Sequence, residues 1–109
     1  MKLPHAGDVR IDERKVRGYL LSESHPVGRF KARVFATLGF DASGAQAFIG
    51  ELRRIAAAGD VSKVVEIPFG QKYTVPGDLE GPLGTAPVLT VWFLERGQER
   101  VRLVTVRLR

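Results

Sequence analysis

Cysteine is absent from this sequence of 109 residues, which excludes disulfide bonds, thiolate metal ligands and thiol catalysis. Long apolar runs are also missing. The longest covers residues 88–94 and is interrupted by Thr90, whereas a membrane-spanning helix needs about 20 apolar residues. The first ten residues hold no apolar segment of a secretory signal peptide. We therefore expect a soluble cytoplasmic protein without a membrane partner, folded as a single domain over residues 1–109.

Acidic residues are the minority among the charged ones. The chain has 17 Lys and Arg against 12 Asp and Glu, a net charge of +5, and an isoelectric point near 10.1. Such basicity in a small domain is typical of nucleic-acid binding and also suits an acidic protein partner. Most of the cationic residues are arginine, whose guanidinium binds phosphate through paired hydrogen bonds. RNA and a small acidic protein are both candidate partners.

Apolar periodicity predicts three helices in the first half of the chain. The first begins at Asp12, a capping residue, and ends near residue 22. The second covers residues 29–38 after a turn at residues 22–28. The third opens at Asp41 or Ser43 and stops at Gly59. The buried stripe expected for the second helix consists of Phe30, Val34, Phe35 and Leu38.

The second half of the chain reads as strands at residues 61–67, 71–75, 88–95 and 101–108. Residues 76–87 hold three glycines and three prolines and are expected to form a mobile connection. The strand at 88–95 is apolar on both faces, so we expect it to be central in the sheet with Trp92 buried. Helices followed by strands indicate an α+β fold, an antiparallel sheet with helices on one face.

The densest polar cluster is residues 25–33, which read HPVGRFKAR. In a helix that begins near Arg29, Arg29 and Arg33 are neighbours one turn apart, and Lys31 lies away from that pair. His25 precedes the helix start, where unpaired backbone N–H groups attract anions. Two interpretations fit this spacing: a phosphate-binding site, or a solvated helix face preceded by a turn.

Histidine is scarce, and His25 is the only plausible group for proton transfer near neutral pH, since His5 lies in an irregular segment. The sequence has no histidines at i, i+4 spacing, no Asp-x-Asp loop and no nucleotide-binding glycine loop. We therefore expect neither a metal site nor a cofactor.

Two strand segments add polar candidates. Alternation places Lys72 on one face of its strand and Tyr73 on the other, where Tyr73 either donates its hydroxyl to a ligand or packs half-buried. Alternation also places Thr105 on the same face as Leu103 and Arg107. A hydroxyl beside a guanidinium can bind phosphate, and a threonine can equally serve as a β-former.

Several motifs together resemble a family of small uncharacterised bacterial domains that occur alone or at the C-termini of polymorphic toxins. They are His25-Pro26-x-Gly28-Arg29-x-Lys31-Ala32-Arg33-Val34-Phe35, Gly70-Gln71-Lys72-Tyr73-x-Val75, Gly81-Pro82-x-Gly84, Trp92 and Arg102-Leu103-Val104-Thr105. The resemblance implies the toxin of a toxin–antitoxin pair. The layout is similar to that of the barnase/EndoU/colicin/RelE group of metal-independent ribonucleases, which is an analogy at the level of the fold.

That resemblance implies RNA cleavage in which His25, Lys31, Tyr73 and Thr105 form the catalytic set. Arg29, Arg33, Lys72 and Arg107 would bind phosphates. EndoU-like enzymes use two histidines where this chain has one well-placed histidine, so the second acid or base would be Lys31, Tyr73 or a group that the sequence does not reveal. The alternative is a non-catalytic basic module that binds RNA or an acidic protein, in which His25 is a turn residue.

Overall fold

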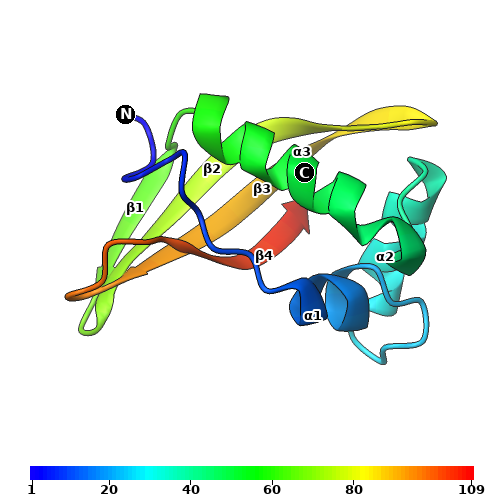
Figure 1. The fold of residues 1–109 in the computed structure, drawn as a ribbon, viewed down its shortest axis with the longest axis horizontal. Helices are drawn as coiled ribbons and strands as arrows, with labels where there is room; N and C mark the ends of the chain where they lie inside the picture. The colour runs from blue at the N-terminus through cyan, green and yellow to red at the C-terminus, as the bar shows by residue number, and fades with distance from the viewer.

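The computed structural model describes residues 1–109 as helices followed by a four-stranded antiparallel sheet (Figure 1). The predicted α+β class is confirmed. The strands are β1 (Lys63–Ile67), β2 (Gly70–Gly81), β3 (Gly84–Glu95) and β4 (Arg102–Leu108), in that spatial order. The helices are α1 (Glu13–Lys15), continued by the π-helical η1 (Val16–Leu20), then α2 (Arg29–Thr37) and α3 (Ala45–Ala58), which follows the 3₁₀ turn η2 (Ala42–Gly44).

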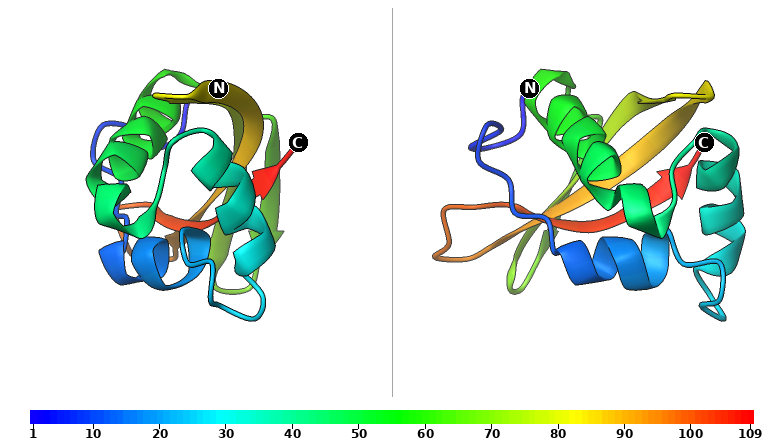
Figure 2. Two further views of the ribbon diagram at one scale, coloured as in Figure 1. Left: turned by 90° about the vertical axis from the view of Figure 1, so that its right-hand side faces the viewer. Right: turned by 45° about the vertical axis from the view of Figure 1, so that its right-hand side comes forward.

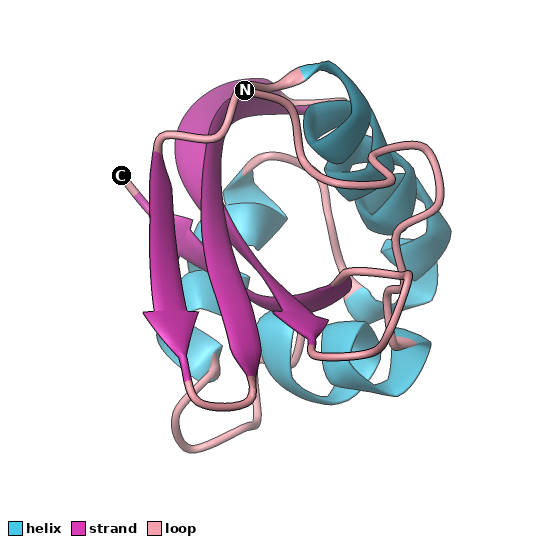
Figure 3. Ribbon diagram, turned by 90° about the vertical axis from the view of Figure 1, so that its left-hand side faces the viewer, coloured by secondary structure: helices cyan, strands magenta, loops and turns pink.

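The helices lie on one side of the curved sheet, and we call the sheet surface that faces them the covered face (Figures 2 and 3). Trp92 of the inner strand β3 is fully buried there, as predicted. Its indole N–H donates to Thr90 at 2.8 Å, and the Thr90 hydroxyl donates to the carbonyl of Val75 at 2.7 Å. The polar atoms beneath the helices are thus paired, which removes the cost of burying them.

Two aspartates begin helical segments. The Asp12 carboxylate accepts the backbone N–H of Arg14 at 2.9 Å, as expected of the cap of α1. The Asp41 carboxylate accepts from the backbone N–H of Gly44 at 2.9 Å and from the hydroxyl of Ser43 at 2.6 Å. Asp41 therefore decides where the third helical segment starts, and Ser43 supports Asp41.

The prediction of an unpaired connection at residues 76–87 is wrong. Strands β2 and β3 pair continuously from Gly70↔Glu95 to Gly81↔Gly84, so the segment is the outer part of one long hairpin. Pro76 on β2 and Pro87 on β3 lie beyond the last pairs with β1 and β4, Lys63↔Thr74 and Val88↔Leu108, and Pro82 lies in the hairpin turn. In this outer part of the hairpin, β2 and β3 pair only with each other. A proline whose missing N–H would face the unpaired side therefore costs no hydrogen bond of the sheet.

Helix α3 holds this outer hairpin in place. Leu79 is fully buried, whereas Leu83 at the tip is exposed. The Arg54 guanidinium donates to the carbonyl of Asp78 at 2.6 Å and to Glu51 at 2.8 Å. Glu51 also accepts the backbone N–H of Glu80 at 2.7 Å. One buried leucine and a pair of charged side chains thus anchor a segment that its glycines and prolines suggested was mobile.

The Glu51 anchor makes stability depend on pH. Hydrogen bonds from Arg54 and from the Glu80 N–H lower the pKa of Glu51 below its ordinary value of 4.5. The stabilisation is therefore present above that value and is lost as pH falls through the folded-state pKa. We expect Glu51→Gln to cost about 1 kcal/mol at pH 7 and almost nothing in acid. Urea unfolding at pH 7 and pH 3 checks this, and an equal loss at both pH values would contradict it.

Candidate functional site

The sheet surface that faces away from the helices, which we call the open face, carries a hollow of about 270 Å³. Its lining combines three cations, two hydroxyls and three aliphatic side chains, and it includes no carboxylate: Ser62, Lys63, Val65, Lys72, Thr74, Leu89, Val91 and Arg107. All six ion pairs of the protein lie elsewhere and involve none of these cations. The hollow has the composition of an anion-binding site.

Strand register explains why these cations gather. Directly opposed residues of antiparallel strands point to the same face. Lys63 on β1 opposes Thr74 on β2, and Thr74 opposes Val91 on β3. Val91 in turn opposes Thr105 on β4. Lys72 lies one rung away and opposes Val65. Lys72 and Thr74 share a face, as the sequence predicted.

A β-bulge corrects the expected position of Thr105. The pairing steps from Trp92↔Leu103 to Val91↔Thr105, so β4 contains one extra residue at this point. Leu103 therefore packs on the covered face opposite Trp92, and Thr105 turns to the open face with Val91. The prediction that Leu103 and Thr105 share one face is wrong, because the bulge interrupts their alternation.

Lys31 reaches from α2 to the margin of the open face. Its Nζ donates to the Thr105 hydroxyl at 3.3 Å. Burial, followed by the positive charges of Arg107 and Lys15, lowers the pKa of Lys31 from 10.5. No carboxylate forms an ion pair with Lys31. The ammonium group is therefore disfavoured in this position and would gain from a bound anion.

His25 joins this site through Tyr19. The Tyr19 ring lies 5.9 Å from Lys31 Nζ and meets the His25 ring edge to face at 4.9 Å between centroids. His25 Nδ1 accepts the backbone N–H groups of Val27 and Gly28, each at 3.0 Å. The imidazole therefore fills the position at the start of α2 where the sequence suggested an anion, and its proton resides on Nε2.

These two hydrogen bonds, which cap the turn that leads into α2, change what His25 variants should do. Loss of an N-terminal cap typically costs about 1 kcal/mol, so we expect His25→Ala to lower the free energy of unfolding by that amount. Asparagine also caps well, and His25→Asn should retain most of the stability while removing the titratable group. Urea unfolding of the two variants checks this, and equal losses would show that Nδ1 contributes nothing to the cap.

The arginines of α2 form a separate patch. Phe30, expected in the core, is 59% exposed. The guanidinium groups of Arg29 and Arg33 lie over its ring at 4.9 and 5.8 Å. Phe35 and Leu38 of the predicted stripe are buried, as expected, and Ala32 joins them on the inner side of α2. At the start of the helix Gly28 packs so closely that a Cβ there would lie 2.3 Å from the Tyr19 carbonyl, and Phe30 is left outside.

Tyr73 is not brought to this site. It lies buried on the covered face and opposes Trp92, and its hydroxyl donates to Gln71. Burial, followed by the charge of Glu66, raises the pKa of Tyr73. The structure thus brings together Lys31 and Thr105, with Arg107 beside Lys31 and Lys72 across the hollow, and leaves Arg29 and Arg33 in their own patch.

Lys63 and Tyr19 are site residues that the sequence interpretation missed. The signal for Lys63 was the hairpin register, because a turn at residues 68–69 places Lys63 opposite Thr74. Tyr19 carried no comparable signal, since its spacing indicated only a helix face. No helix of the protein is long and apolar enough to cross a membrane, and no group of three or more His, Asp and Glu side chains is placed to hold a metal ion.

The chain belongs to a family of domains of unknown function, DUF6883, which it matches over residues 2–108. Its fold is similar to that of a chain in a contact-dependent growth inhibition toxin–immunity protein complex from Klebsiella pneumoniae 342. That similarity has a TM-score of 0.71 at 16% sequence identity and covers 91% of this chain and 98% of the other. The chain has no match among curated proteins.

Proposed function

We propose that the chain is a toxin-like domain that cleaves RNA without a metal ion and binds it on the open face. The observation that carries the proposal is the environment of Lys31, a lysine of lowered pKa held by Thr105 beside a hollow lined by cations. Perturbed ionisable groups with specific partners are typical of catalytic sites. The fold similarity to a chain from a toxin–immunity protein complex supports the toxin-like role.

The chemistry requires three kinds of group. The 2′-hydroxyl attacks the adjacent phosphorus, a 2′,3′-cyclic phosphate forms, and the bond to the 5′-oxygen of the next nucleotide breaks. A base takes the 2′-hydroxyl proton, an acid protonates the leaving oxygen, and cations stabilise the charge on the phosphate. Lys31 is the acid in this proposal, Thr105 orients it, and Arg107 and Lys72 bind the phosphate. His25 is the candidate base.

A protein partner follows from the same surface. Three cations without ion pairs around one hollow form a surface that a neutralising protein would cover with acidic residues. The similar chain comes from a complex of a toxin with its immunity protein. We therefore propose an acidic, immunity-like partner that blocks the open face.

Incubation of the purified chain with total RNA and with a labelled oligoribonucleotide, with and without EDTA, tests this function. We expect cleavage products that end in a 2′,3′-cyclic phosphate in both conditions. His25→Asn keeps the cap and should abolish the cleavage, which separates proton transfer from folding. Intact RNA after prolonged incubation with folded protein would contradict the proposal.

A non-catalytic binding module is the second candidate, and the position of His25 favours it. Use of His25 as a base at Nε2 requires the proton to move to Nδ1, which breaks both bonds to the backbone of the turn before α2. In a binding module His25 is only a cap, and Lys31 binds an anion without transferring a proton. Salt-sensitive RNA binding without any cleavage would establish this second function.

A further inference from the structure

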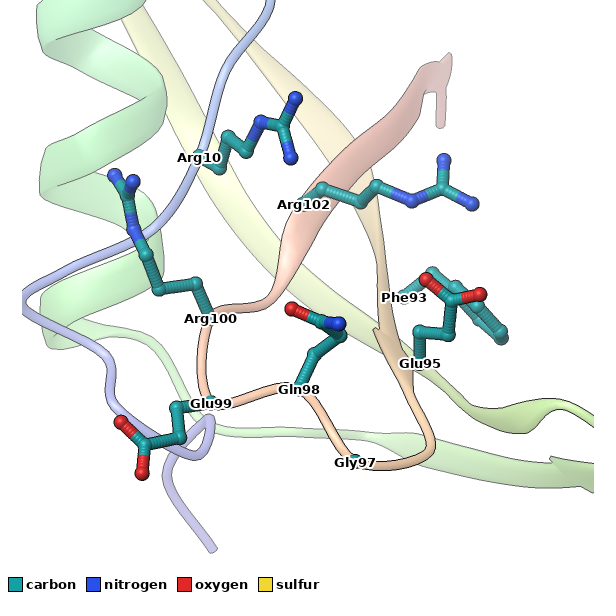
Figure 4. A pocket seen from close by; sticks show the side chains of 8 residues that line it. All are labelled: Arg10, Phe93, Glu95, Gly97, Gln98, Glu99, Arg100 and Arg102. Atoms are coloured by element: carbon teal, nitrogen blue, oxygen red, sulfur yellow. The ribbon is translucent and has the colours of Figure 1, made fainter.

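The largest hollow of the protein lies at the other end of the open face, between β4 and the chain before α1. It measures about 620 Å³, and its lining includes Arg10, Arg102, Arg100 and Gln98 (Figure 4). Arg10 and Arg102 also line a second hollow of about 240 Å³ with Lys15 and Asp12. The two arginines therefore stand at the boundary between two cavities.

The backbone places these two arginines side by side. Arg10 and Arg102 oppose each other in an isolated parallel bridge. The Arg10 N–H donates to Val101 at 2.8 Å, and the Arg10 carbonyl accepts from Leu103 at 2.9 Å. Neither guanidinium forms an ion pair. Two like charges placed next to each other without an ion-pair partner repel each other, and an anion bound between them would relieve that repulsion.

The lining of this hollow also includes two carboxylates and a third arginine, Glu95, Glu99 and Arg100, and neither carboxylate forms an ion pair with Arg10 or Arg102. Arg100 is paired with Asp8 at 3.4 Å, and Figure 4 shows the Arg100 and Glu99 side chains directed away from Arg10 and Arg102. The Arg102 guanidinium lies over the ring of Phe93 at 5.1 Å, which restricts its position. The pair is thus available to a ligand and partly preorganised.

The arginine pair is connected to the Lys72 hollow along one row of the sheet. Arg102 opposes Phe93, and Phe93 opposes Lys72 on the next strand. Arg102 and Lys72 are therefore two strands apart on the same face, about 10 Å. A polyanion that crosses the open face would contact both sites, whereas a mononucleotide would reach one.

We infer that Arg10 and Arg102 form a second phosphate-binding site, which engages an RNA strand at a distance from Lys31. The inference rests on the proposed function for the identity of the ligand, and it specifies the substrate class as an RNA strand several nucleotides long. The recognition is of the phosphate backbone and is independent of base sequence.

The test uses fluorescence anisotropy with a 12-nucleotide 2′-O-methyl RNA, which binds without being cleaved. Each phosphate contact to a single strand contributes about 0.7 to the slope of log affinity against log salt. We expect Arg10→Gln with Arg102→Gln to reduce that slope by about 1.4. Arg10→Lys with Arg102→Lys should retain it. Arg96 is an exposed arginine that forms no ion pair, and Arg96→Gln is the matched control. This variant should leave intact the contribution of Arg10 and Arg102 to the slope.

An unchanged slope in the double glutamine variant would overturn the inference, as would an equal reduction in Arg96→Gln. A 12-residue polyglutamate peptide serves as a second probe. If the double variant loses affinity for the peptide but not for the RNA, the site binds an acidic protein and the inference fails. Thermal melts of every variant exclude unfolding, and Arg10→Gln alone leaves the stacking on Phe93 in place. The anisotropy experiment does not measure cleavage, so it can fail or succeed independently of the ribonuclease proposal.

Discussion

Lys31→Met is expected to lower the rate of RNA cleavage by at least about a hundredfold while leaving the fold intact. Methionine fills much of the space of the lysine chain but cannot protonate the leaving oxygen or neutralise a phosphate. Initial rates on a labelled oligoribonucleotide measure the effect. Lys31→Arg is the informative control, because arginine keeps the charge but does not release its proton near neutral pH. Equal loss in both variants indicates proton transfer, whereas activity in the arginine variant would contradict it.

The stability of the same variant distinguishes a functional lysine from a structural one. The folded protein lowers the pKa of Lys31 below 10.5, so between the lowered value and 10.5 the unfolded chain binds more protons. Wild-type stability therefore rises with pH across that window. In Lys31→Met this rise should disappear, and stability at neutral pH should equal or exceed that of the wild type. A clear loss of stability would mean that Lys31 mainly supports the fold.

Much of the architecture could be predicted from the sequence because the strongest signals are local. Asp12 and Asp41 are capping residues in front of apolar periodicity, and both cap the segments that follow. Trp92 lies in a strand that is apolar on both sides and occupies an inner position of the sheet. These features depend on side chains close in sequence, which is where pattern rules work.

The errors arose where distant segments decide the outcome. Glycines and prolines in residues 76–87 suggested a loop, but pairing across the hairpin and contacts from Glu51 and Arg54 on α3 make it a strand pair. Phe35 of the predicted stripe is buried, but Phe30 is exposed, because Gly28 packs against Tyr19 and Ala32 takes the inner side at that end of α2. The local propensity of a segment predicts its structure only weakly, because tertiary contacts of this kind override it.

The candidate site was predictable in part for the same reason. Lys31 and Thr105 were both identified as candidates, but their contact joins residues 74 positions apart. The two faces of β4 also depend on a bulge, which alternation alone does not reveal. Arg10 was overlooked because it lies in an irregular segment, and only the bridge to Arg102 gives it a place beside the sheet.

Deletion of Val104 is expected to remove the bulge and yet leave both faces of β4 as they are. The extra residue at this point separates Leu103, which faces Trp92, from Thr105, which turns to the open face with Val91. Without Val104, these two residues become neighbours, and regular alternation still directs Leu103 to the covered face and Thr105 to the open face. Arg102 and Arg107 then also stay on the open face, so no arginine enters the apolar layer, which would cost several kcal/mol.

We therefore expect the Val104 deletion to lower the free energy of unfolding by about 1 kcal/mol, through loss of the local twist at the bulge, and to retain salt-sensitive RNA binding. Val104→Ala is the matched control: it keeps the bulge, and because Val104 is only partly buried it should cost no more than about 1 kcal/mol. Urea unfolding and anisotropy with the 12-nucleotide strand measure both effects. A loss of about 3 kcal/mol or more, or a loss of binding, would contradict this expectation. The twist at the bulge, rather than alternation alone, would then be what brings Thr105 within reach of Lys31.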